Sequence, residues 1–128
     1  MTELVFVTGN MNKVQQVERF LGRKLEHHKL DLDEIQDIDP ARVLEHKAKE
    51  AYRILQKPVL VEDASLVFSA MGRLPGPFIK YFLEELGNEG LIHLLNGYND
   101  RSAVHTVIFG LYDGNKFYGF SASITAKI

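Results

Sequence analysis

The sequence has no cysteine, no tryptophan and no long uninterrupted run of apolar residues. Without cysteine the chain forms no disulfide and offers no thiolate ligand to a metal, which is typical of a reducing compartment. We therefore expect a cytoplasmic location. The amino-terminal segment MTELVFVTGN carries Glu3 and only a short apolar stretch, so it predicts neither a signal peptide nor a membrane span.

The chain also lacks an excess of charge of one sign. It has 15 basic and 17 acidic residues and a formal net charge of -2. No overall field draws such a chain to nucleic acid or to an anionic membrane, so we expect neither as a partner, and any anion site must be local. With 128 residues, 45% of them hydrophobic and 25% charged, the sequence predicts one globular domain over residues 1–128.

Predicted strands and helices alternate along most of the chain. Strands are expected at Leu4–Val7, at a more polar edge segment Leu25–Leu32 and after Pro58, and helices at Met11–Leu21, from Pro40, at Pro77–Leu86 and at Glu89–Leu95. The turn Asp113-Gly114-Asn115 predicts a hairpin between Ser102–Tyr112 and Lys116–Ser123. This order predicts an α/β fold with a mixed sheet flanked by helices.

Two adjacent carboxylates, Glu62 and Asp63, follow the apolar residues Val59–Val61. Open α/β sheets place ligands at the carboxyl ends of strands, so the pair is a candidate site. Side chains alternate along a strand, and we expect a turn at Asp63–Ser65 that directs both carboxylates into one crevice. Taken alone, the pair is explained more simply as two polar residues at the point where a strand ends and a loop begins.

A candidate phosphate site follows the first predicted strand. Thr8-Gly9-Asn10 lies before a helix whose amino-terminal amides attract anions, and Lys13 adds a positive charge in its first turn. A lysine at this end of a helix is unfavourable unless an anion offsets it. The plainer alternative is a capped surface helix with a solvated lysine.

The loop before Pro40 is rich in acidic residues: Asp31, Asp33, Glu34, Asp37 and Asp39. It is either a solvated loop or part of a magnesium site shared with Glu62 or Asp63. Magnesium prefers oxygen ligands and usually takes one or two protein carboxylates with phosphates and waters. The five histidines show no metal-ligand spacing, and the aromatic residues Phe78, Tyr81 and Phe82 are more simply core residues.

In order, these pieces resemble the inosine/xanthosine triphosphate pyrophosphatase family. Three blocks carry the resemblance: FVTGNMNKVQQV (Phe6 to Val17), DLDEIQ (Asp31 to Gln36) and the long segment Val59 to Leu95. The resemblance implies an ITPase-like fold, here without most of its C-terminal lobe, because the family continues for a further third beyond Phe120–Ile128. The 128 residues would then be the amino-terminal two thirds of the family's usual length.

The resemblance also implies a site and a reaction. Thr8, Gly9, Asn10 and Lys13 would hold phosphate, with Lys47 and Lys80 near the triphosphate. Glu34, Glu62 and Asp63 would bind Mg²⁺, Asp63 would also orient or deprotonate the attacking water, and Lys13 would be the second catalytic residue. The implied reaction converts a non-standard purine nucleoside triphosphate (ITP, dITP or XTP) to monophosphate and pyrophosphate, and the implied assembly is a homodimer.

The sequence departs from the family pattern at three places. Ala64 stands where the family has threonine after the acidic pair, and Asp37 stands where it commonly has glycine. The segments that grip the purine base in the family have no counterpart here. An alternative is therefore a nucleotide-binding homologue without catalysis or with altered specificity, or a fragment.

Overall fold

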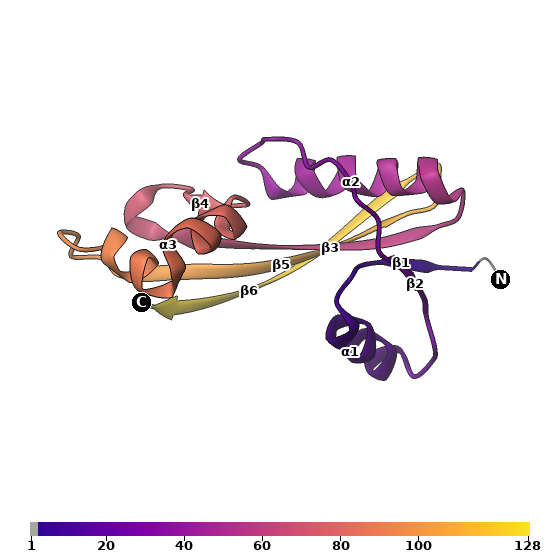
Figure 1. The fold of residues 1–128 in the computed structure, drawn as a ribbon, viewed down its shortest axis with the longest axis horizontal. Coiled ribbons are helices and arrows are strands. Elements are labelled where there is room, and N and C mark those ends of the chain that lie inside the picture. The colour runs from indigo at the N-terminus through magenta and orange to yellow at the C-terminus, as the bar shows by residue number, and fades with distance from the viewer. Residues whose placement is uncertain (1–2) are drawn as a thin grey trace.

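The computed structural model describes residues 3–128 and has an elongated shape (Figure 1). Its elements in chain order are β1 (Val5–Val7), α1 (Met11–Leu21), β2 (Glu26–His28), α2 (Pro40–Leu55), β3 (Val59–Phe68), a 3₁₀ turn (Ser69–Met71), β4 (Pro75–Gly76), α3 (Ile79–Leu94), β5 (Ser102–Tyr112) and β6 (Phe117–Lys127). Between residues 3 and 128, no helix is long and apolar enough to cross a membrane.

The strands form one mixed sheet in the order β2-β1-β3-β5-β6. β2, β1 and β3 run parallel, whereas β5 and β6 continue the sheet in antiparallel fashion as a long hairpin. Helices lie against this sheet (Figure 1), and the predicted mixed α/β fold is confirmed.

Helix boundaries follow the local caps. Asn10 caps α1 with its side chain, and Gly22 ends that helix at a left-handed φ of 71°. Asp39 caps α2 and Pro40 occupies its first turn. In α3, Gly87 at φ 68° interrupts the helical backbone, so this helix consists of two pieces, as the sequence predicts.

The two faces of β3 pack against different helices. Val59 and Val61 join Leu44 and Ala48 of α2 in one buried cluster. Leu60, on the opposite face, packs against the cluster that contains Val14 of α1. A third cluster, formed by Phe68, Leu91, Leu95 and Ala103, lies at the far end of the sheet beneath α3.

The prediction that Glu62 and Asp63 lie at the carboxyl end of this strand, with a turn at Asp63–Ser65, is wrong. β3 continues for ten residues to Phe68, because β5 pairs with every residue from Val59 to Phe68. Glu62 and Asp63 therefore alternate like other strand residues, Glu62 toward the α1 side and Asp63 toward the α2 side.

Two predicted strand bounds also change. β2 covers only Glu26–His28 of the expected segment Leu25–Leu32, because β1 offers just Val5–Val7 as partners. β6 extends to Lys127 rather than Ser123, because β5 pairs with it down to Ser102.

A gap along one edge of β3 positions the site. β5 occupies one edge of β3 throughout, so the other edge holds β1 at Val59 and Leu60 and β4 at Leu66 and Val67. No strand of residues 3–128 pairs with this edge in between. Within residues 3–128, the main chain of Glu62, Asp63 and Ala64 therefore has no strand partner on this side.

Candidate active site

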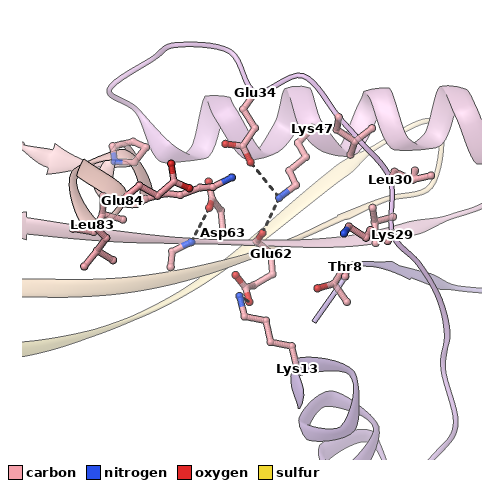
Figure 2. Close-up of a pocket in the computed structure, with 17 residues that line it drawn as sticks. Thr8, Lys13, Lys29, Leu30, Glu34, Lys47, Glu62, Asp63, Leu83 and Glu84 are labelled. Atoms are coloured by element: carbon pink, nitrogen blue, oxygen red, sulfur yellow. Dashed lines mark hydrogen bonds and ion pairs between the residues drawn. The ribbon is translucent and has the colours of Figure 1, made fainter. Parts of the chain in front are cut away.

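The gap beside β3 opens into a cavity of about 530 Å³. Its walls come from the loop after β1, the first turn of α1, the segment after β2, α2, β3 and the start of α3 (Figure 2). The predicted residues that line it are Thr8, Gly9, Lys13, Glu34, Lys47, Glu62, Asp63 and Lys80. The cavity lies past the carboxyl ends of parallel strands, where open α/β sheets place ligands.

Glu62 forms an ion pair with the first turn of α1. Lys13 Nζ lies 2.5 Å from Glu62 Oε2, and the Glu62 side chain is only 9% exposed. This carboxylate offsets the cost of a lysine at the amino-terminal end of a helix. Lys13 and Glu62 are thus held together on the α1 side of the sheet.

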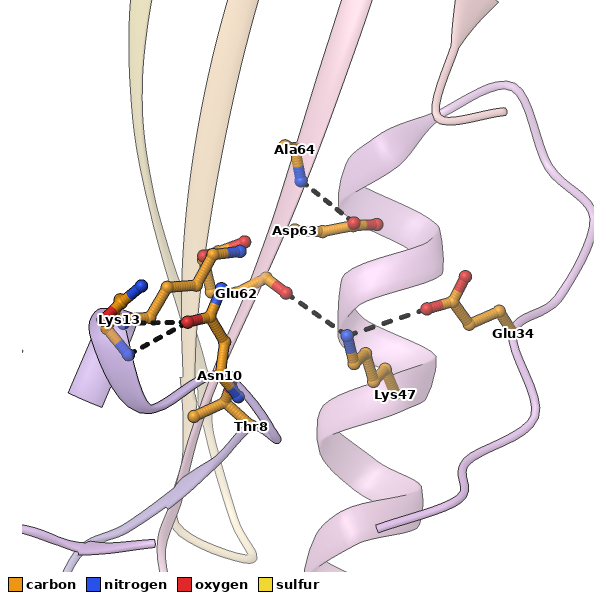
Figure 3. A network of polar contacts seen from close by, with 9 residues as sticks. Thr8, Asn10, Lys13, Glu34, Lys47, Glu62, Asp63 and Ala64 are labelled. Carbon is orange, nitrogen blue, oxygen red and sulfur yellow. Dashed lines mark hydrogen bonds and ion pairs between the residues drawn. The ribbon is translucent and has the colours of Figure 1, made fainter. Parts of the chain in front are cut away.

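Lys47 connects α2 to β3 and to the acidic loop. Its ammonium group donates a hydrogen bond of 3.2 Å to the main-chain carbonyl of Glu62 and lies 3.7 Å from Glu34 Oε1 (Figure 3). The Lys47 side chain is 18% exposed, so solvent screens these contacts only in part. Through this lysine, the loop carboxylate Glu34 lies close to the Glu62–Asp63 pair.

Asp63 is a partly buried carboxyl group with a shifted pKa. Burial raises its pKa above the ordinary aspartate value, while Lys47 and the Ala64 N–H oppose the shift and the charges of Glu34 and Glu62 add to it. Its Oδ1 accepts a 2.9 Å hydrogen bond from the Ala64 N–H. This contact uses the main chain, so the alanine at position 64 retains it without a hydroxyl.

Asn10 is the one predicted site residue that does not line the cavity. Its Oδ1 instead accepts hydrogen bonds from the N–H groups of Asn12 (3.0 Å) and Lys13 (3.3 Å). Thr8 Oγ1 in turn accepts the Asn10 N–H at 3.2 Å. Asn10 therefore fixes the start of α1 and, with it, the position of Lys13.

Lys29, which is not among the predicted site residues, also lines the cavity. Lys29 directly follows β2, and the Thr8 N–H donates a 2.9 Å hydrogen bond to the carbonyl of the preceding residue, His28. No local sequence pattern marks Lys29 as a cavity residue, because its position depends on β1 and β2 lying parallel and side by side.

The carboxylate oxygens of this cavity fit a divalent cation only if a bound phosphate supplies further oxygen ligands. Among residues 3–128, no three histidine, aspartate or glutamate side chains are grouped closely enough to hold a metal. Magnesium commonly takes one or two protein carboxylates and completes its shell with phosphate oxygens and water. Glu34, Glu62 and Asp63 all line one cavity, and one or two of them together with phosphate oxygens fit this mode.

The fold and this cavity define a class of protein: an open α/β sheet with lysines and carboxylates gathered past the ends of β1 and β2 and beside the middle of β3. Residues 4–128 match the model of the Ham1 family, and the chain belongs to that family. It is 48% identical over 106 residues to the inosine triphosphate pyrophosphatase of Batrachochytrium dendrobatidis. The match covers 80% of this chain and 55% of the fungal protein, so the chain spans about half the length of that curated relative.

Solved structures show the same fold. The Ham1 protein of Staphylococcus aureus superposes with a TM-score of 0.83 at 19% identity, covering 98% of this chain and 71% of that one. A nucleoside-triphosphatase (dITP/XTP pyrophosphatase) from Mycobacterium abscessus gives a TM-score of 0.83 at 15% identity, covering 98% of this chain and 74% of that one. The ITPase-like fold expected from the sequence is thereby confirmed.

Proposed function

We propose that this chain hydrolyses non-standard purine nucleoside triphosphates (ITP, dITP and XTP) to nucleoside monophosphate and pyrophosphate, with Mg²⁺ as cofactor. The observation that carries the proposal is the position of Asp63, a carboxylate of raised pKa in a cavity that also holds Lys13 and Lys47. The name of the fungal relative supports the substrate class.

In the proposed reaction, a water molecule attacks the α-phosphorus of the nucleotide. Asp63 accepts a proton from that water, the new P–O bond forms, and the bond between the α-phosphorus and the bridging oxygen breaks, releasing pyrophosphate. A carboxylate whose pKa is raised is a better proton acceptor than an ordinary aspartate. Lys13 and Lys47 neutralise phosphate charge, which is the main requirement of phosphoryl transfer.

Bound Mg²⁺ would neutralise further phosphate charge and align the oxygens around the reacting phosphorus. Glu62 and Asp63 are the carboxylates of β3 that would hold it, with Glu34 contributing from the loop before α2. Glu62 already pairs with Lys13, and Glu34 with Lys47. These lysines would turn from the carboxylates toward the phosphates when the metal and the nucleotide bind.

The test is a pyrophosphate-release assay with ITP, dITP and XTP, compared with ATP and GTP, in the presence and absence of Mg²⁺. We expect release from the deaminated nucleotides only when Mg²⁺ is present. Asp63→Asn should reduce the rate by about 10²- to 10⁴-fold, the usual contribution of a general base. A wild-type chain that is inert toward the whole panel would contradict the proposal.

The ion pairs also favour a second candidate function, nucleotide binding without turnover. Glu62 and Glu34 each contact a lysine, so two of the three candidate metal ligands are already neutralised. Calorimetry of ITP binding separates the two functions. Binding without pyrophosphate release would support the second one, and turnover would exclude it.

A further inference from the structure

We propose that Lys29 is a positioning residue for the pyrophosphate end of the substrate, which makes it a fourth cavity lysine beside Lys13, Lys47 and Lys80. The inference rests on the proposed function, since it assigns the part of a nucleoside triphosphate that Lys29 contacts. Three observations support it: Lys29 has no ion pair within residues 3–128, its main chain is fixed by a hydrogen bond between the adjoining loops, and the strand order sets its place in the cavity.

Lys29 has charge available for a ligand. Lys13 and Lys47 are paired with Glu62 and Glu34, whereas Lys29 forms no ion pair or hydrogen bond with another side chain of residues 3–128. Figure 2 shows its ammonium group directed into the space that Thr8 and Glu62 border. Of the four cavity lysines, Lys29 and Lys80 form no ion pair within residues 3–128, so their charges are available to a phosphate.

The main chain at Lys29 is fixed against the loop after β1. The 2.9 Å hydrogen bond from the Thr8 N–H to the His28 carbonyl joins the two segments directly before Lys29. The stem of Lys29 then passes across Gly9, where an added Cβ would lie 2.9 Å from Lys29 Cδ and 3.1 Å from Cγ. Gly9 does not have a positive φ, so a side chain at this position would displace the Lys29 stem without straining the backbone.

The strand order decides which phosphate Lys29 contacts. β1 lies between β2 and β3, so Lys29, after β2, borders the side of the cavity away from Asp63 on β3. The reacting α-phosphorus must lie near Asp63, because Asp63 accepts the proton of the attacking water. The remaining phosphates extend from there toward Thr8 and Lys29, which places Lys29 at the leaving pyrophosphate.

The experiment measures binding of inorganic pyrophosphate by calorimetry in metal-free buffer, with inosine monophosphate as the contrasting ligand. We expect Lys29→Ala to weaken pyrophosphate binding by about tenfold or more, as for other hydrogen bonds to charged groups, and to leave inosine monophosphate binding unchanged. Lys29→Arg should retain most of the affinity. Lys24→Ala is the matched control, because Lys24 is an exposed lysine just before β2 and does not line the cavity.

Gly9→Ala supplies a second, independent readout. The added methyl group would displace the Lys29 stem, so it should weaken pyrophosphate binding in the wild-type background and have little further effect in Lys29→Ala. In turnover, Lys29→Ala should raise KM for the triphosphate more than it lowers kcat.

The assignment is overturned if Lys29→Ala binds pyrophosphate as wild type does, if wild type does not bind pyrophosphate, or if Gly9→Ala acts equally in both backgrounds. These outcomes concern binding of an inorganic ligand, so they are distinct from failure of the hydrolysis assay. A chain that depends on Lys29 for pyrophosphate binding but releases none from ITP would leave this assignment standing and contradict the proposed reaction alone.

Discussion

At the scale of single residues, Asp63 carries a conflict between stability and function. Burial raises its pKa, so the folded chain holds the proton more tightly than the unfolded chain does. The contribution of Asp63 to stability is therefore most favourable below the ordinary aspartate pKa and is lost as pH rises through the raised value. At neutral pH the folded state bears the full cost of a partly buried charge.

Asp63→Asn should relieve that cost and raise the melting temperature at neutral pH while abolishing most activity. The asparagine oxygen can still accept the Ala64 N–H, so the local geometry is kept. Thermal unfolding in metal-free buffer, followed by circular dichroism at neutral and acidic pH, checks the expectation. The gain should shrink at acidic pH, where the aspartate is protonated in both states. A lower melting temperature at neutral pH would contradict the argument.

The same shift predicts the acidic limb of the pH profile. If Asp63 accepts the proton, kcat/KM should fall as pH is lowered through the raised pKa of Asp63. That limb should therefore lie at higher pH than an ordinary aspartate would give, and the residual rate of Asp63→Asn should lack it. A limb that persists unchanged in Asp63→Asn would assign the proton to another group.

At the scale of elements, sequence predicts best what local chemistry decides. The bounds of α1, Met11–Leu21, and the break at Gly87 in α3 follow from caps and glycines within a few residues. The extent of β3 does not follow from nearby residues, because its continuation past Asp63 depends on pairing with β5, some forty residues later in the chain. Lys29 was missed for a related reason, since only the parallel pairing of β1 and β2 brings it beside Thr8.

The candidate site shows the same division. The family resemblance pointed to Thr8, Lys13, Glu62 and Asp63, and the structure gathers them in one cavity. The predicted turn is not what brings these residues together. β3 stays extended, and its edge between β1 and β4 has no strand partner within residues 3–128. Side chains from both faces of β3 therefore border one cavity.

The cap of α1 gives a prediction for an element as a whole. Asn10→Ala removes the acceptor for the Asn12 and Lys13 N–H groups and should cost about 1 kcal/mol of folding stability. Asn10→Ser restores a capping oxygen and should recover most of that loss. Urea unfolding of both variants measures the difference, with Asn12→Ala as the control at an adjacent exposed position. If serine restores stability but not ITP affinity, Asn10 contacts the nucleotide as well.

At the scale of the whole molecule, the β5–β6 hairpin has two unlike faces. Tyr118, Phe120, Ala122, Ile124 and Ala126 alternate along one face of β6, whereas the other face carries Gly119, Ser121, Ser123 and Thr125. Phe120 is 59% exposed and Ile124 is 67% exposed. An alternating pattern of this kind is typical of a strand that buries its apolar face, yet no element of residues 3–128 covers these side chains. We propose that a second copy of the chain covers them, in line with the homodimer that the family resemblance implies.

Association through this face should be sensitive to Phe120 and Ile124 but insensitive to the opposite face. Burial of one such side chain contributes about 1.5–3 kcal/mol, so Phe120→Ser should weaken a dimer at least tenfold and the double variant with Ile124→Ser should be monomeric at micromolar concentration. Light scattering coupled to size-exclusion chromatography gives the mass directly, and Ser121→Ala serves as the control because its side chain lies on the polar face. Both substitutions lie on an exposed surface, so they should leave the folded monomer intact, which the melting temperature verifies. A wild-type chain that is monomeric at every concentration, or a dimer unchanged in the double variant, would show that another surface or another partner covers this face.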